Sequence, residues 1–201
     1  MYLILREDFL SVVPKFLRRC VASASKIRVR LAENRPQKQV HERLREYIKM
    51  KERKNMTIIR PMQPADKEAV LAMMEVFYTS PAVFTNGSAT IYSNDFEACV
   101  SDNPYLEGYM FEENGQIQGY AMTAKSFSTE FGRPCIWLED IYIKEAFRGT
   151  GIGSQFLEFI GNMYPEAVLR LEVEEENGRA VKVYEKNGFN VLPYMEMKKL
   201  L

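Results

Sequence analysis

The spacing of apolar residues changes from an irregular N-terminal part to a regular body that begins near Met56. Residues 65–78 place apolar side chains at helical spacing behind an acidic first turn, which predicts an amphipathic helix. Residues 105–111 and 116–127 have the composition of half-buried strands, and the short segment that joins them ends in Asn114-Gly115. An Asn-Gly pair in that position is typical of a tight hairpin turn.

The rest of the body continues this alternation of strands and helices. We expect strands at 57–60, 134–143 and 167–173, a loop-rich stretch at 81–93, helices at 94–101, 151–163 and 178–186, and one or two closing strands within 190–199. An antiparallel meander that leads into a βαβ crossover predicts an α/β (α+β) fold. Its central sheet is mixed and mostly antiparallel, with helices on both faces.

The distribution of charge divides the chain at the same point. Residues 1–55 contain 15 Lys and Arg against 6 Asp and Glu, a net charge of +9, and residues 56–201 carry −9. We therefore expect a basic N-terminal extension, partly disordered or helical, followed by a globular domain at 56–201. Residues 9–17 are compatible with a short helix. Leu44 and Ile48 form an apolar stripe in 41–54 that looks too narrow for a core helix.

Two interpretations of the extension stay open, a solvated appendage and a basic arm for RNA, anionic lipid or an acidic partner. No aromatic residues are interleaved with its basic residues, so a nucleic-acid partner is not favoured. The chain has no apolar run of about 18 residues and no signal-peptide pattern, which argues against a membrane span or secretion.

The cysteines and the histidine limit the chemistry. Cys20, Cys99 and Cys135 are odd in number and widely spaced, which fits neither a disulfide framework nor a metal site and predicts a cytoplasmic protein. The single histidine, His41, excludes a Ser-His-Asp triad or a multi-histidine metal site in the body. Catalysis, if present, would depend on carboxylates, tyrosine or backbone groups, without a metal.

The sequence Arg148-Gly149-Thr150-Gly151-Ile152-Gly153 lies where a predicted strand gives way to a helix. It lacks the lysine of a P-loop, and its third glycine comes one position early for a dinucleotide fingerprint. Glycines that free backbone N–H groups at a helix start, beside a fixed arginine cation, suit a bound pyrophosphate. The alternative is a glycine-rich turn with a solvated arginine.

This run, with Asn177-Gly178-Arg179-Ala180 and the segment 183–189 behind it, resembles the acetyl-CoA-binding motifs of the GNAT superfamily of N-acetyltransferases. The resemblance covers about 57–201 and implies a GNAT-like acyl-CoA acyltransferase fold with acetyl-CoA as cosubstrate. The cofactor-binding residues that it implies are Ile141, Tyr142, Ile143, Arg148, Gly149, Thr150, Gly151, Ile152, Gly153, Ser154 and Asn177.

Within the superfamily, the segment Trp137-Leu138-Glu139-Asp140-Ile141-Tyr142 is most similar to the diamine (spermidine/spermine, thialysine) N-acetyltransferases. The similarity implies that Glu139 acts as the base through water and that Asp140 binds the substrate. It also implies that Tyr184 protonates the leaving sulfur. The partners that we expect are a small, cationic primary amine and a second copy of the chain.

Each of these residues also has an ordinary structural interpretation. Glu139 and Asp140 could be surface ion-pairing groups, Tyr184 a core aromatic, and Asn177 a helix cap. The acidic run at 172–176 is either a solvated edge or a means of attracting a cation. For the whole protein, the alternatives are a non-catalytic acyl-CoA-binding regulatory module and a nicotinamide-dinucleotide-binding protein.

Overall fold

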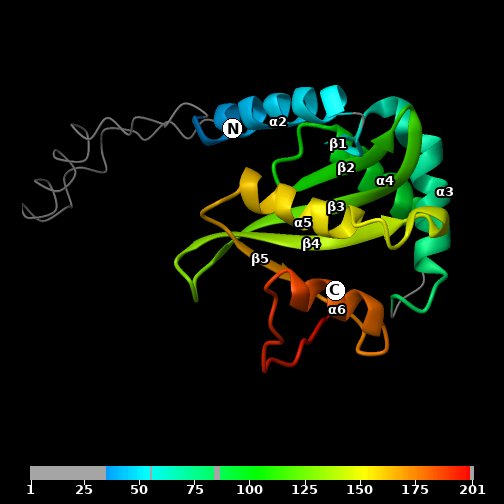
Figure 1. The fold of residues 1–201 in the computed structure, drawn as a ribbon. Helices are drawn as coiled ribbons and strands as arrows, with labels where there is room; N and C mark the ends of the chain where they lie inside the picture. Colours follow the sequence, from blue (N-terminus) through cyan, green and yellow to red (C-terminus); the bar gives the residue numbers. More distant parts are fainter. Residues whose placement is uncertain (1–34, 55, 84–86, 200–201) are drawn as a thin grey trace, which may run out of the picture. The chain divides into compact units, whose positions relative to one another are not determined.

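The computed structural model describes residues 35–54, 56–83 and 87–199, and the fold is set out below for the compact unit that begins at Val40. Figure 1 shows its helices and strands in chain order. They are α2 (Arg35–Lys54), β1 (Ile58–Pro61), η2 (Pro64–Asp66), α3 (Lys67–Tyr78), α4 (Ala89–Val100), β2 (Leu106–Glu113), β3 (Gln116–Ser128), β4 (Arg133–Ile143), η3 (Glu145–Phe147), α5 (Ile152–Met163), β5 (Val168–Leu171) and α6 (Gly178–Lys186).

The five strands form one sheet in the order β1-β2-β3-β4-β5. Neighbours are antiparallel as far as β4, and β5 then pairs with β4 in parallel after the α5 crossover. The hairpin between β2 and β3 turns at Asn114 and Gly115, whose φ angles are +51° and +77°, as a tight turn of this type requires. The predicted mixed and mostly antiparallel sheet is confirmed.

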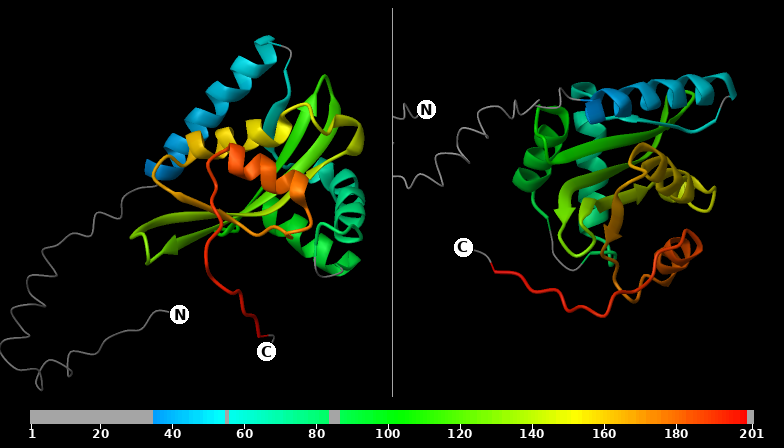
Figure 2. Two further views of the ribbon diagram at one scale, coloured as in Figure 1. Left: turned by 60° about the horizontal axis from the view of Figure 1, so that its bottom comes forward. Right: turned by 90° about the vertical axis from the view of Figure 1, so that its left-hand side faces the viewer.

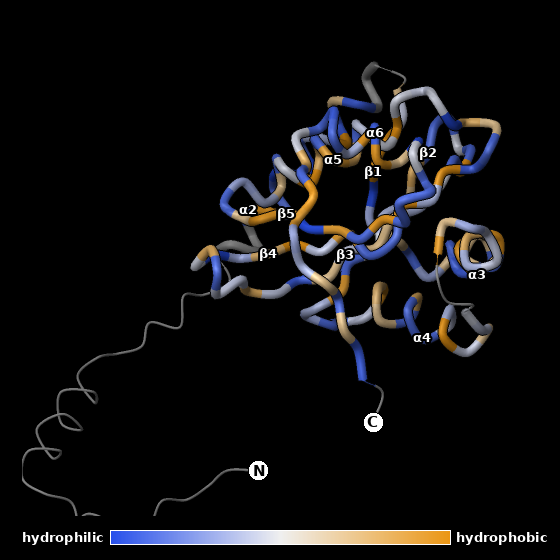
Figure 3. Tube along the Cα trace, turned by 90° about the horizontal axis from the view of Figure 1, so that it is seen from below, coloured by the Kyte–Doolittle hydropathy of each residue, from blue (hydrophilic) through white to orange (hydrophobic). Residues whose placement is uncertain are grey.

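Helices cover both faces of the sheet, because each face carries its own apolar cluster. One cluster contains Met74 of α3, Phe96 of α4 and Tyr120 of β3. The other contains Phe111 of β2 and Phe156 of α5. Figure 2 shows the two helical layers, and Figure 3 shows β3 and β4 between α3 and α4 on one side and α5 and α6 on the other.

The start of α4 and the C-terminal segment differ from the sequence predictions. Helix α4 begins at Ala89, before the predicted position 94, because Ser88 caps it by accepting a hydrogen bond from the backbone N–H of Ile91. The closing strands predicted within 190–199 are wrong, since this segment contains no strand. Its apolar side chains find no sheet face to pack on, and Val191 is 89% exposed. The helix proposed at 9–17 lies outside the described residues.

The N-terminal helix α2 packs on the body more closely than its sequence pattern predicts. Val40, Leu44 and Tyr47 lie against the apolar cluster of α5, and the Tyr47 ring centroid is 4.8 Å from that of Phe159. Val40 and Tyr47 widen the Leu44 stripe, so the interpretation of this helix as too narrow to pack was wrong. A functional boundary between an extension at 1–55 and a domain at 56–201 stays a prediction. The packed unit in the structure begins at Val40.

We predict that a chain beginning at Met56 is less stable than one beginning at Arg35. Removing α2 removes its apolar contacts with α5 and exposes the surface of α5 that it covers. We expect this to lower the free energy of unfolding by about 2–3 kcal/mol. For a domain of this size that corresponds to a fall in Tm of roughly 5–10 °C. Calorimetry of the two chains measures it, and equal Tm values would show that α2 contributes no stability.

Candidate functional site

Strand β4 has a neighbour on both sides for only part of its length. Its parallel ladder with β5 runs from Cys135–Val168 to Leu138–Leu171, and the register pairs no residue of β4 beyond Leu138 with β5. The antiparallel pairing with β3 continues to Ile143. The outer edge of β4 after Leu138 therefore presents backbone groups that β5 does not use, and such an edge can pair with an extended ligand.

A β-bulge occurs at the same point of β4. Leu138 pairs with Thr123 and Asp140 with Met122, so Glu139 is the extra residue between them. Bulges disrupt the ladder locally and redirect side chains, and they are frequent beside active sites. Here Glu139 is exposed and Asp140 is buried.

Glu139 belongs to a cluster of carboxylates drawn from four parts of the chain. Partial desolvation raises the pKa of Glu139, and the charges of Asp95 on α4 and Glu196 in the C-terminal segment raise it further. The pKa of Glu172, just after β5, is raised by partial burial and then by a hydrogen bond to Glu196. The charge of Arg170 partly offsets the rise in the pKa of Glu172, and neighbouring acids that raise one another's pKa favour the arrival of a cation.

The sequence did not reveal this cluster in full. Within the acidic run 172–176, Glu172 is the residue whose raised pKa is attributed in part to the charge of Glu139. Asp95 and Glu196 were missed, because α4 and the C-terminal segment reach β4 only through the tertiary fold. No sequence spacing signals that proximity.

Asp140 lies inside the protein, where two tyrosines hold its carboxylate. The Tyr78 hydroxyl donates to Oδ1 at 3.0 Å and the Tyr120 hydroxyl donates to Oδ2 at 2.9 Å. Burial raises the pKa of Asp140 to about 6, although both hydrogen bonds act in the opposite direction. The side chain is 4% exposed, so contact of Asp140 with a substrate stays a prediction.

The connection from β4 to α5 presents backbone N–H groups at a helix start. Gly149 and Gly151 have φ angles of +85° and +92°, which residues with a side chain rarely adopt. The Thr150 hydroxyl donates to the Phe147 carbonyl at 2.7 Å and holds the turn closed. The first helical bond runs from the Gln155 N–H to the Gly151 carbonyl, so the N–H groups before Gln155 are not used by the helix.

Arg148 and Ser154 have protein partners in this structure. Arg148 Nε donates to the Ile143 carbonyl at 2.9 Å, at the end of β4. Ser154 Oγ accepts from Asn187 Nδ2 at 3.0 Å, which ties α5 to α6. Arg179 of α6 comes close to the loop as a second cation, since its Nη2 lies 3.4 Å from where a Cβ on Gly149 would stand.

Helix α6 carries the two other predicted site residues. Asn177 caps it, with Oδ1 accepting from the Ala180 N–H at 3.3 Å, so the structural interpretation of Asn177 holds whatever else it binds. Tyr184 packs against the same cluster as Ile141 and Ile143, and its ring centroid lies 5.8 Å from that of Phe189. Burial raises the pKa of Tyr184, so its phenol stays protonated at neutral pH.

The side chains on β4 limit how its residues can contribute. Tyr142 is buried against Phe77 and Tyr120 on the α3 face and pairs with Tyr120 of β3, so its side chain is not available to a ligand at the open edge. Trp137 lies on the last paired stretch of β4, where the Arg170 guanidinium stands 4.6 Å from its ring centroid. This stack closes the paired end of the β4–β5 gap.

The described part of the chain contains neither a group of residues suited to a metal ion nor a helix suited to cross a membrane. In residues 35–54, 56–83 and 87–199, no group of three or more His, Cys, Asp or Glu is arranged to hold a metal ion. No helix in these ranges has the length and apolar character needed to cross a membrane. A cytoplasmic location stays a prediction.

This open strand edge, with a glycine-rich helix start at its end, matches a known family. A family model described as "Acetyltransferase (GNAT) family" matches residues 71–189. The chain therefore belongs to the GNAT acetyltransferase family. The predictions of this fold and of an acetyltransferase enzyme are confirmed at the level of the family.

Two curated relatives share part of the chain. Thialysine N-epsilon-acetyltransferase of Bos taurus is 39% identical over 75 residues, which cover 36% of this chain and 44% of the relative. The Sus scrofa protein of the same name is 37% identical over 73 residues, 35% of this chain and 42% of the relative. The matches thus span less than half the length of these relatives.

Solved structures share the fold at low identity. A possible acetyltransferase from Clostridium difficile 630 has a TM-score of 0.62 at 17% identity, with 72% of this chain and 97% of the other covered. An aminoglycoside N-acetyltransferase in complex with CoA has a TM-score of 0.58 at 17% identity, with coverages of 72% and 94%.

We predict that Gly153→Ala weakens the binding of CoA by about tenfold or more, equivalent to ~1.4 kcal/mol. The new Cβ would stand 3.7 Å from Ile143 Cδ1 and 3.9 Å from Val183 Cγ1, where it fits the protein but narrows the space beside the helix start. Tm should stay level or rise slightly, since alanine favours a helix over glycine. Titration calorimetry measures the Kd.

Gly161→Ala is the matched control, because Gly161 lies in the same helix with open space around its Cβ position. Gly151→Val would test the loop less cleanly, since the positive φ of Gly151 would strain a valine with or without ligand. Equal affinity of both alanine variants and the wild type for CoA would reduce the loop to a structural turn.

Proposed function

We propose that the protein is an acetyl-CoA-dependent N-acetyltransferase that moves the acetyl group directly to the primary amine of a small, cationic substrate within a ternary complex. The observation that carries this proposal is the open edge of β4 beyond Leu138, which has the exposed Glu139 at its start and the unused N–H groups of α5 at its end. An extended thioester with a terminal pyrophosphate suits that combination of strand edge and anion site.

The residues fit the cosubstrate in a simple way. Backbone groups of Ile141 and Ile143 would pair with its amides, as a neighbouring strand would. The helix start at Gly151–Gly153, with Arg148 and Arg179 beside it, would hold the pyrophosphate. When bound, acetyl-CoA supplies the activated acyl group, and the protein supplies position and proton transfer.

Glu139 would take the proton that the amine must lose, directly or through water. An alkyl ammonium with a pKa near 10 is almost wholly protonated at neutral pH and cannot attack a carbonyl carbon. The raised pKa of Glu139 makes it a stronger base than an ordinary glutamate. Once the proton has left, the nitrogen lone pair forms the new C–N bond.

A backbone N–H in 141–143 would stabilise the oxyanion that develops on the acetyl oxygen. As the C–S bond breaks, Tyr184 would give its phenolic proton to the departing sulfur. The burial that raises the pKa of Tyr184 keeps this proton in place until then. The nitrogen that attacked gives up its second proton, which restores the phenol of Tyr184 directly or through water. The proton that Glu139 accepted returns to solvent, so the products are the amide, the free thiol and one proton.

The carboxylate cluster supports a cationic substrate. The charges of Asp95 and Glu196 raise the pKa of Glu139, and those of Glu196 and Glu139 raise the pKa of Glu172, so an ammonium group would relieve this repulsion. The names of similar proteins agree with an amine acceptor, since they refer to thialysine and aminoglycosides. Thiol-release kinetics with acetyl-CoA and a panel of polyamines, amino acids and aminoglycosides tests the proposal. No turnover above hydrolysis with any amine would contradict it.

We predict that Tyr184→Phe lowers kcat by roughly 10²–10⁴-fold, the usual range for a positioned proton donor. The ring contacts with the apolar cluster remain, so Tm and the Kd of CoA should barely change. Tyr105→Phe, at a 69% exposed tyrosine, controls for the loss of a phenol elsewhere. Wild-type kcat in Tyr184→Phe would remove this residue from the mechanism.

We predict that Glu139→Gln lowers kcat/KM most near neutral pH and recovers partly at high pH, where free amine forms without a base. In the wild type, kcat/KM should fall as the pH drops through the raised pKa of Glu139, because protonation removes the base. The variant should lack this acid limb. The exposed Glu185→Gln on α6 is the control, and an unchanged pH profile in Glu139→Gln would contradict the assignment.

A further inference from the structure

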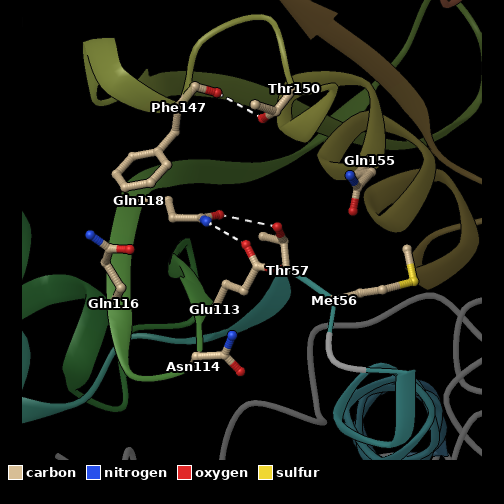
Figure 4. Close-up of a pocket in the computed structure, with 9 residues that line it drawn as sticks. All are labelled: Met56, Thr57, Glu113, Asn114, Gln116, Gln118, Phe147, Thr150 and Gln155. Carbon is tan, nitrogen blue, oxygen red and sulfur yellow. Dashed lines mark hydrogen bonds between the residues drawn. The ribbon is translucent and has the colours of Figure 1, made fainter.

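A cavity lies beside the start of α5, next to the β2–β3 hairpin and the start of β1. Its volume is about 410 Å³, which is the scale of a small-molecule site. The residues around it come from the start of β1, the β2–β3 hairpin, η3, the glycine loop and the first turns of α5, as Figure 4 shows. They are Met56, Thr57, Glu113, Asn114, Gln116, Gln118, Phe147, Thr150 and Gln155.

Gln118 is the buried polar centre of this cavity. It is the unpaired residue of a bulge between β2 and β3, where Phe111 pairs with Gly119 and Glu112 with Ile117. Its side chain is 3% exposed, accepts from Thr57 Oγ1 at 3.1 Å and donates to Glu113 Oε2 at 2.8 Å. An amide offers two donors and two acceptors, so Gln118 can serve a ligand as well.

The cavity has a negative charge on its wall and a positive charge, Lys51, behind one lining residue. The carboxylate of Glu113 stands on the hairpin side. On the helix side, the amide of Gln155 accepts from Lys51 Nζ at 3.4 Å, which brings a cation from α2 to that wall. The Phe147 ring adds an apolar surface. A ligand with an ammonium at one end and a carboxylate at the other would satisfy both walls.

We propose that this cavity is a second binding site, for a small dipolar molecule of the amino-acid type. The ammonium group of the ligand would lie at Glu113, and its carboxylate would face Gln155 and Lys51. None of the residues that line it belongs to β4 or β5, so the site differs from the acyl-transfer gap along the β4–β5 edge.

The same cavity contacts the loop that holds the pyrophosphate in the proposed function. Phe147 and Thr150 form part of its wall, and their hydrogen bond closes the loop turn. Gln118 reaches the loop by a second path, because its carbonyl accepts from the Lys144 N–H at 2.9 Å just before η3. A ligand that fixes these residues would also fix the loop and raise the affinity for CoA, and CoA would raise the affinity for the ligand equally.

The test uses N,N-dimethylglycine as the probe. Its tertiary ammonium keeps one N–H for Glu113 but has no further hydrogen to exchange for an acetyl group, so it forms no stable amide. We expect calorimetry on the full chain without CoA to show binding. Dimethylamine and acetate, which carry one charge each, should bind at least about tenfold more weakly, as should Glu113→Gln and Lys51→Met.

Two variants control for charge alone. Glu166→Gln removes an exposed carboxylate after α5, and Lys49→Met removes an exposed cation from α2; both should bind dimethylglycine as the wild type does. Absence of binding, equal binding of all four variants, or equal affinity for dimethylamine and dimethylglycine would overturn the site. This binding measurement needs no CoA and no turnover. It therefore tests the cavity even if the acetyltransferase proposal fails.

The second arm measures the Kd of CoA with and without saturating dimethylglycine. We expect an increase in CoA affinity of about fivefold in the wild type and none in Glu113→Gln. Unchanged CoA affinity in a wild type that binds dimethylglycine would overturn the link to the loop.

Discussion

The site depends on one constraint, which is that β4 keeps its pairing with β3 to Ile143 but loses β5 after Leu138. Strand β3 continues to pair with β4 beyond Leu138, so β4 remains extended there without a strand at its outer edge. The bulge at Glu139 falls at the point of separation and leaves its carboxylate at the entrance of the gap. Every proposed contact along β4 relies on this difference between its two edges.

The fold was largely readable from local sequence. Strands β2, β3 and β4 and helices α5 and α6 lie within a few residues of their predicted ranges, because apolar periodicity and the Asn114-Gly115 turn act over short distances. The segment 190–199 was misjudged for the opposite reason. Its apolar residues look like a strand, but a strand needs a partner, and Pro193 removes one backbone donor.

The site was readable only in part. The glycine run and Tyr184 could be predicted as site residues because they lie in contiguous motifs. Asp95 and Glu196 became visible only when the fold placed them near Glu139, and the Tyr78 and Tyr120 hydroxyls only when it placed them on Asp140. The packing of helix α2 could not be predicted for the same reason, because Val40 and Tyr47 pack on a surface of α5 that exists only in the folded domain.

The stack of Arg170 on Trp137 gives the protein a natural optical reporter. Trp137 is the single tryptophan of the chain, and it lies two residues before Glu139 on the last paired stretch of β4. Its emission depends on the guanidinium above the ring and on the water around the gap. Entry of a ligand between β4 and β5 would alter both, so intrinsic fluorescence of the unlabelled protein can follow occupancy of the gap in real time.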